Sequence, residues 1–129
     1  MTLYDQHLHT ELSPDSSEKM QNYLELARQR GISHFITTEH MDLASGTSRM
    51  DILPDFGLQR EHLEYWQKKF PGIKLLMGLE LGHKPSQAKR AEEIVRSQPF
   101  DFILLSIHET EECDVLTEEF LAGKTSDEI

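Results

Sequence analysis

Histidines and carboxylates are the residues of this chain with the clearest potential for chemistry, and the first group lies near the N-terminus. His7 and His9 are separated by one residue, and Asp15 follows closely. Residues two apart on a β-strand point to the same side, so both imidazoles would face one way. Neutral imidazole is a good ligand for zinc, manganese and iron. The pair is therefore a candidate metal clamp, and a surface strand that carries two histidines by chance is the alternative.

Three further candidates, His40, Glu80 and His108, each stand at the end of a segment rich in apolar and β-branched residues, which predicts a buried strand. These strand-like segments span residues 32–38, 73–77 and 100–107. The first histidine pair closes an expected strand over residues 3–9. Each of the four expected strands therefore ends on a candidate ligand.

Apolar residues at helical spacing predict helices between these strands. They are expected over residues 20–30, with Gly31 just past the helix end, from residue 58 to Pro71, from Pro85 onward, and over residues 115–121. Residues 41–57 are expected to form a long loop near the site. Alternating strands and helices predict an α/β fold with a parallel sheet, open or rolled into a barrel, whose ligands gather at the carboxyl ends of the strands.

The composition limits the classes of partner. The 129 residues suit one domain, residues 1–129, and a formal net charge of -10 argues against nucleic acid or an anionic membrane surface. The single cysteine, Cys113, allows no internal disulfide. No segment reaches the roughly 20 apolar residues of a membrane span, and no signal-peptide pattern is present. We therefore expect a cytoplasmic protein.

Together the candidates form a mixed imidazole and carboxylate set that suits two or three divalent ions, with Glu80 placed to bridge two of them. The set comprises His7, His9, Asp15, His40, Glu80 and His108. Such clusters hydrolyse phosphate esters, because the ions activate water and neutralise the phosphoryl oxygens. We expect Glu80, His40 and His108 to be catalytic. The sequence shows no glycine-rich phosphate loop and no Gly-x-Ser-x-Gly elbow, so no protein nucleophile is indicated.

Five short motifs resemble, in order and spacing, those of the PHP (polymerase and histidinol phosphatase) domain superfamily, and most closely its histidinol-phosphatase branch. They lie at residues 5–10, 13–16, 38–40, 78–80 and 106–108. The resemblance implies a distorted, TIM-like β/α barrel of about seven strands with up to three divalent metal ions (Zn, Mn or Fe) at its mouth. It also implies that the partner is a small phosphorylated substrate.

Carried over residue by residue, the resemblance makes His7, His9 and Glu80 ligands of one metal, Glu80 and His108 ligands of a second, and Asp15 and His40 ligands of a third. The substrate that it suggests is L-histidinol phosphate, in histidine biosynthesis. Two alternatives stay open. One is a phosphoesterase acting on nucleotides or phosphotyrosine proteins, and the other is a noncatalytic metal-binding or assembly module.

The resemblance covers the first half of such an enzyme, about four β/α units. Family members contribute a further histidine and a final Asp-x-His pair, and nothing after His108 matches them. We therefore expect an incomplete metal site with small or absent phosphatase turnover. We also expect the chain to self-associate, because open sheet edges and uncovered apolar faces invite association.

Three other residues have weaker functional potential. His34 lies within an expected strand and is predicted to be packed in the core, and His62 lies on the polar face of a helix and is predicted to be solvated. Glu39 adjoins a candidate ligand. It either orients an imidazole from outside the metal shell or makes ordinary hydrogen bonds at the strand end.

Overall fold

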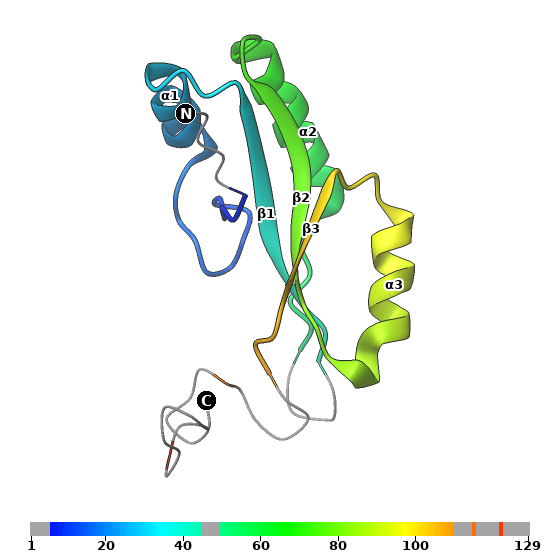
Figure 1. Cartoon of the computed structure of the whole chain (residues 1–129). Coiled ribbons are helices and arrows are strands. Elements are labelled where there is room, and N and C mark those ends of the chain that lie inside the picture. Colours follow the sequence, from blue (N-terminus) through cyan, green and yellow to red (C-terminus); the bar gives the residue numbers. More distant parts are fainter. Residues whose placement is uncertain (1–5, 45–49, 110–114, 116–121, 123–129) are drawn as a thin grey trace.

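The computed structural model describes residues 6–44, 50–109, 115 and 122. Its centre is a parallel sheet with the strand order β1 (His34–Asp42), β2 (Lys74–Gly82) and β3 (Phe102–Ser106). Helix α1 (Met20–Gln29) precedes the sheet, α2 (Phe56–Lys69) links β1 to β2, and η1 (Pro85–Gln87) with α3 (Ala88–Ser97) links β2 to β3 (Figure 1). The alternation of helices and parallel strands confirms the α/β class expected from the sequence.

The sheet buries one set of side chains against the helices. Phe35 and Met77 pack with α1 and with Leu63 of α2, and Leu79 and Leu81 pack with Ala91 of α3. Successive side chains of a strand point to opposite faces, so His40 and Glu80 lie on the other side of the sheet. Packing against the helices holds the strands in place, and the opposite face of the sheet carries the polar residues His40 and Glu80.

Local sequence signals set the ends of the helices. Gly31 has a φ of 67° and directly follows the last turn of α1, where its amide donates to the Arg28 carbonyl and the Ile32 amide donates to that of Ala27. These two bonds form a Schellman motif, and the positive φ explains why glycine stands there. At the start of α2, the Asp55 carboxylate caps the helix by accepting from the Leu58 amide at 2.9 Å.

The expected first strand over residues 3–9 is wrong for residues 6–9, which belong to no strand, and its earlier residues lie outside the described part. Leu8 pairs with β1 through one backbone bond, from the Thr38 amide to the Leu8 carbonyl at 2.8 Å. Its own amide donates to the Thr38 hydroxyl at 3.0 Å. A side-chain oxygen thus replaces the carbonyl that a regular ladder would use.

Other boundaries differ from expectation at the end of the chain and in the long loop. Strand β1 continues to Asp42, and the Asp42 backbone pairs with Ile52, so the loop expected from residue 41 begins later and is partly anchored.

Of the helix expected over residues 115–121, only Val115 is described, and it lies in a turn. Cys113 lies outside the described residues. No helix in the described ranges has the length and apolar character needed to cross a membrane.

Candidate metal centre

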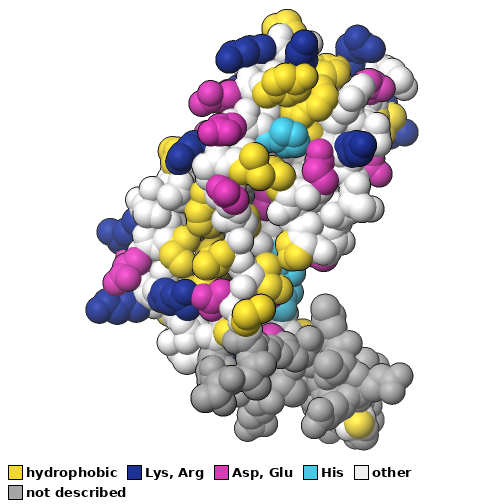
Figure 2. Space-filling model, turned by 180° about the vertical axis from the view of Figure 1, so that it is seen from behind, with side chains coloured by type: hydrophobic (Ala, Val, Ile, Leu, Met, Phe, Trp, Pro, Cys, Tyr) yellow, Lys and Arg dark blue, Asp and Glu magenta, His cyan; other side chains and the backbone are white. Residues whose placement is uncertain are grey.

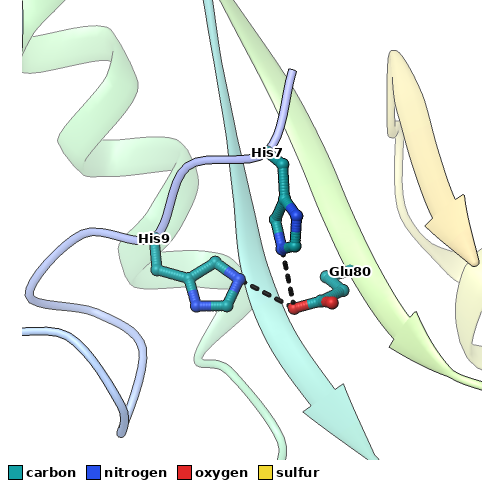
Figure 3. Close-up of side chains that lie close together, drawn as sticks. All are labelled: His7, His9 and Glu80. Carbon is teal, nitrogen blue, oxygen red and sulfur yellow. Dashed lines mark ion pairs between the residues drawn. The ribbon is translucent and has the colours of Figure 1, made fainter. Parts of the chain in front are cut away.

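A buried carboxylate, Glu80 of β2, is the point on which the candidate ligands converge. Glu80 is 3% exposed. The Nε2 atoms of His7 and His9 lie 3.2 and 2.8 Å from its Oε2 atom (Figure 3). The Nε2 atom of His108 lies 3.2 Å from Oε1, and the Ser106 hydroxyl donates to the same oxygen at 2.7 Å. Three segments that are far apart in the sequence therefore meet at one carboxyl group.

The pairing of β1 with β2 places His40 beside Glu80. The two residues are register partners in the parallel ladder, so their side chains leave the same face at the same level. The Nδ1 atom of His40 lies 3.7 Å from Oε2 of Glu80 and 3.1 Å from Oδ2 of Asp15. Asp15 also approaches His9, whose Nδ1 atom lies 3.0 Å from both carboxylate oxygens. The structure thus brings all six residues of the predicted ligand set together.

The loop that carries Asp15 is anchored by Glu39, a fully buried carboxylate of β1. Thr10 donates to it from its amide at 3.1 Å and from its hydroxyl at 2.8 Å, and the Ser13 hydroxyl donates at 2.6 Å. Within the described residues, the hydrogen bonds of Glu39 go to this loop and not to an imidazole. Of its two predicted roles, the structure supports ordinary hydrogen bonding at the strand end, and that bonding fixes the loop.

Asp42 is the site residue that the sequence analysis missed. Its Oδ2 atom lies 2.7 Å from Nε2 of His40, and its Oδ1 atom lies 3.1 Å from Nδ1 of His108. The signal that could have found it is its spacing from His40. Because the two residues are two positions apart on one strand, their side chains point to the same face. The expectation that the strand ends on His40 and that a loop begins at residue 41 hid this relationship.

The electrostatics of the cluster favour ionised carboxylates. Burial raises the pKa of the Glu80 carboxyl, but the hydrogen bond from Ser106 and the interactions with His7 and His108 outweigh it and bring the pKa to about 2. Burial likewise raises the pKa of Asp42, and hydrogen bonds with His40 and His108 outweigh it, so the net shift is downward. These carboxylates therefore carry negative charge at neutral pH.

His40 responds in the opposite direction. Its hydrogen bond to Asp42 outweighs partial burial, and together with Asp15 it raises the pKa of His40 to about 9. The site thus favours positive charge at this position. A proton can supply that charge, and so can a divalent cation shared between the imidazole and the carboxylates.

The donor set fits a divalent metal ion. The Nε2 atom of His9 is buried and makes no hydrogen bond, although it lies 2.8 Å from Oε2 of Glu80. Because Asp15 occupies its other ring nitrogen, His9 faces an ionised carboxylate on both sides, and a neutral imidazole has only one N–H to offer. A cation between His9 and Glu80 would satisfy both groups. Mixed nitrogen and oxygen ligands of this kind suit zinc, manganese or iron.

Three overlapping groups present ligand atoms that lie within 4.8 Å of one another. The groups are His7, His9 and Glu80; His9, Asp15 and His40; and His40, Asp42 and His108. The first matches the set that the resemblance assigns to one metal ion. The second contains both residues assigned to the third ion. The last contains Asp42, which the resemblance does not assign.

Comparison with protein families matches residues 5–128 to the PHP domain. The chain belongs to the PHP domain family. Among curated PHP relatives, the histidinol-phosphatase of Lactococcus lactis subsp. lactis is 29% identical over 132 residues, which cover 99% of this chain and 48% of the relative. A probable histidinol-phosphatase of Clostridium acetobutylicum is 28% identical over 106 residues, which cover 82% of this chain and 39% of the relative.

A solved PHP structure supports the same fold. The crystal structure of histidinol phosphate phosphatase from L. lactis, complexed with zinc, L-histidinol and phosphate, superposes with a TM-score of 0.87 at 29% identity. The superposition covers 96% of this chain and 47% of that chain. The α/β architecture is thus confirmed as that of the PHP histidinol phosphatase barrel, and this chain spans about half the length of the relatives that it matches.

The structure corrects the predictions for two histidines outside the PHP site. His34 is exposed rather than packed in the core, because it is the first residue of β1 and lies where the ladder with β2 begins, opposite Lys74. His62 is half-buried rather than solvated. Its Nε2 atom accepts a hydrogen bond of 3.1 Å from the Trp66 indole, one helical turn along α2, and this contact holds the imidazole against the helix.

Proposed function

We propose that this chain carries the metal-binding part of a metal-dependent phosphomonoesterase, and that the predicted ligand set holds divalent ions. The observation that carries the proposal is the convergence of three imidazole Nε2 atoms on buried Glu80, at 3.2, 2.8 and 3.2 Å. The buried Nε2 atom of His9, which makes no hydrogen bond, supports a cation at this place. The proposed ligands are His7, His9, Asp15, His40, Glu80 and His108.

The substrate that we propose is L-histidinol phosphate. Support comes from relatives named histidinol-phosphatase at 26 to 29% identity, and from the related crystal structure that contains L-histidinol and phosphate. The acidic balance of the chain, with a net charge of -10, also suits phosphate chemistry in which metal ions offset the protein's own field. The reaction is hydrolysis of the phosphomonoester to L-histidinol and phosphate.

The chain's own residues have defined tasks in this scheme. When bound, divalent ions supply Lewis-acid stabilisation of phosphoryl charge and activate water for attack on phosphorus. Glu80 offers a fully ionised carboxylate because its pKa is about 2, and Ser106 holds one of its oxygens. His40 and His108 flank Glu80 and help to close the ligand shell. None of these residues needs to act as a nucleophile.

Metal binding and hydrolysis are tested separately on the purified chain. Zinc or manganese is added, metal content is measured, and phosphate release is then followed with L-histidinol phosphate, nucleotides and a phosphotyrosine peptide. We expect bound metal in the chain, much less in Glu80→Gln, and unchanged content in Glu93→Gln, an exposed position on α3. Hydrolysis, even if slow, should be fastest with L-histidinol phosphate and should stop when a chelator is added.

Each negative outcome removes a different part of the proposal. A chain that retains no metal contradicts the metal centre itself. Faster release from a nucleotide or from the phosphotyrosine peptide contradicts the substrate. Bound metal without any phosphate release favours the noncatalytic metal-binding module.

A further inference from the structure

The Asp42 carboxylate lies against both His40 and His108 on the side of each ring that faces away from Glu80. It is 2.7 Å from Nε2 of His40 and 3.1 Å from Nδ1 of His108. The other nitrogen of His40 faces Asp15 at 3.1 Å, and the other nitrogen of His108 faces Glu80 at 3.2 Å. Each imidazole therefore lies between two carboxylates.

A neutral imidazole cannot serve two carboxylates in the same way. One ring nitrogen carries a proton and donates, and the other carries the lone pair that binds a metal ion. An ionised carboxylate only accepts, so the N–H must point to one carboxylate and the lone pair toward a cation beside the other. Glu80 also gathers His7 and His9, whereas in the described part of the chain the Asp42 side chain contacts His40 and His108. The cation side is therefore that of Glu80 for His108 and that of Asp15 and Glu80 for His40, and the N–H side of both rings is that of Asp42.

The fold makes room for Asp42 by means of a glycine. Gly82 is the register partner of Asp42 in the β1 and β2 ladder. A Cβ atom at Gly82 would lie 1.5 Å from Oδ1 of Asp42 and 2.9 Å from Nδ1 of His108. The backbone of Asp42 is also held by a two-way pairing with Ile52, at 3.0 and 2.8 Å. The backbone pairing thus fixes the position from which the Asp42 side chain extends, and Gly82 leaves the space that its carboxylate occupies.

We propose that Asp42 is a positioning residue that fixes the tautomer and orientation of two metal-binding imidazoles. It accepts from Nε2–H of His40 and from Nδ1–H of His108, so Nδ1 of His40 and Nε2 of His108 are left for metal. Carboxylates that accept from ligating histidines orient the ring and increase its basicity. This inference rests on the proposed function, because it presupposes that the cluster binds divalent ions.

Zinc titration of the full chain with a competing chelator tests the proposal through affinity and stoichiometry. In Asp42→Asn we expect the same number of zinc ions as in the wild type, with about 10- to 100-fold weaker binding. Asp51→Asn is the matched control, because Asp51 lies in the loop after β1 and pairs with Arg90 and the Ala44 amide. It should bind zinc like the wild type.

Three results of this titration would overturn the proposal. Wild-type affinity in Asp42→Asn means that the carboxylate does not position the rings. Loss of a whole zinc ion means that Asp42 is itself a ligand, in the group that it forms with His40 and His108. A wild-type chain that binds no zinc overturns the proposed function first and this inference with it, so the two failures are distinguishable.

Two further measurements keep the test valid if Asp42→Asn folds poorly. Nitrogen-15 NMR of the imidazoles in the zinc-loaded wild type should show the proton on Nε2 of His40 and on Nδ1 of His108, and the reverse tautomers contradict the proposal. Gly82→Ala should weaken zinc binding about as much as Asp42→Ala, and the double variant should be no weaker than either single variant. Additive losses would mean that Gly82 acts independently of Asp42.

Discussion

The Ser13 hydroxyl donates a hydrogen bond of 2.6 Å to Oε2 of Glu39 and accepts one of 2.9 Å from the His40 amide. One serine thus joins the loop that carries Asp15 to the strand that carries His40. Glu39 is fully buried, and among the described residues its carboxylate is the acceptor for the Ser13 hydroxyl. The geometry of the metal centre therefore depends on a residue that touches no imidazole in the described structure.

Glu39→Ala should strongly destabilise the fold. It leaves the Thr10 and Ser13 donors without their acceptor in a buried place, and each unsatisfied buried group costs about 1–3 kcal/mol. We expect the free energy of unfolding to fall by about 3 kcal/mol in total. Urea denaturation followed by circular dichroism measures it, and Glu93→Ala on the exposed face of α3 is the control. Equal transition midpoints for the two variants would contradict the anchoring role.

Gly78→Ala should also destabilise the fold, for a steric reason. A Cβ atom there would lie 2.6 Å from the Thr37 carbonyl oxygen and 2.9 Å from Cγ2 of Thr38, and the first of these atoms belongs to the backbone of the adjacent strand. Overpacking of this kind costs about 1–3 kcal/mol. Thermal unfolding should show a lower Tm for Gly78→Ala than for Gly72→Ala, where nothing lies within 4 Å of the added atom. A similar Tm for both variants would mean that the strands move apart without cost.

The His7→Ala/His9→Ala double variant should lose bound metal. Both imidazoles face Oε2 of Glu80, so their removal leaves that carboxylate without two nitrogen partners. Elemental analysis after dialysis against zinc gives the metal content per chain. His34→Ala removes an exposed imidazole at the start of β1 and should retain the wild-type value. Unchanged stoichiometry in the double variant would refute the assignment of these two ligands.

Zinc affinity should increase with pH between about 7 and 9. In the metal-free protein the pKa of His40 is about 9, so its imidazole carries an extra proton at neutral pH. Zinc must displace that proton, and the competition weakens as the pH approaches the pKa. The apparent affinity should therefore rise by up to about tenfold per pH unit and level off above pH 9. Chelator-buffered titrations at several pH values measure the slope, and a flat profile would contradict this linkage.

The chain should self-associate through the edge of β3. Leu105 is 61% exposed on this strand, and Ile107 just beyond it is 65% exposed. Figure 2 shows the opposite side of the molecule from Figure 1, with apolar side chains also visible among charged ones. Size exclusion with light scattering should give a mass above that of one chain. Ile107→Asp should reduce that mass and Leu58→Asp on α2 should not; a monomeric wild type would contradict the prediction.

Most of the architecture follows from local chemistry that a sequence displays directly. The helix end at Gly31 and the strands that carry Glu80 and His40 depend on conformational preference and apolar pattern, which act within a few residues. The shared direction of His7 and His9 was also predicted, although not the route to it. The Leu8 amide donates to the Thr38 hydroxyl instead of a carbonyl of a neighbouring strand, and no pattern in residues 6–9 predicts this bond.

The residues that escaped prediction depend on pairing between strands. Asp42 gains its role because β1 continues past His40 and because the register sets it opposite Gly82. The register is a property of two segments together, so neither segment shows it alone. The boundary of β1 also explains the wrong prediction for His34. Its exposure depends on its position at the start of the strand, and strand boundaries are poorly marked in sequence.

The close approach of Asp42 to Gly82 makes the residues that are allowed at these two positions depend on each other. A side chain at position 82 and the observed orientation of the Asp42 carboxylate exclude each other, because an added Cβ would lie 1.5 Å from Oδ1. We therefore expect relatives with a larger residue at position 82 to lack an aspartate at position 42 or to turn its carboxylate away from the histidines. Joint substitution at the two positions would record, without any structure, which descendants hold their histidines in another way.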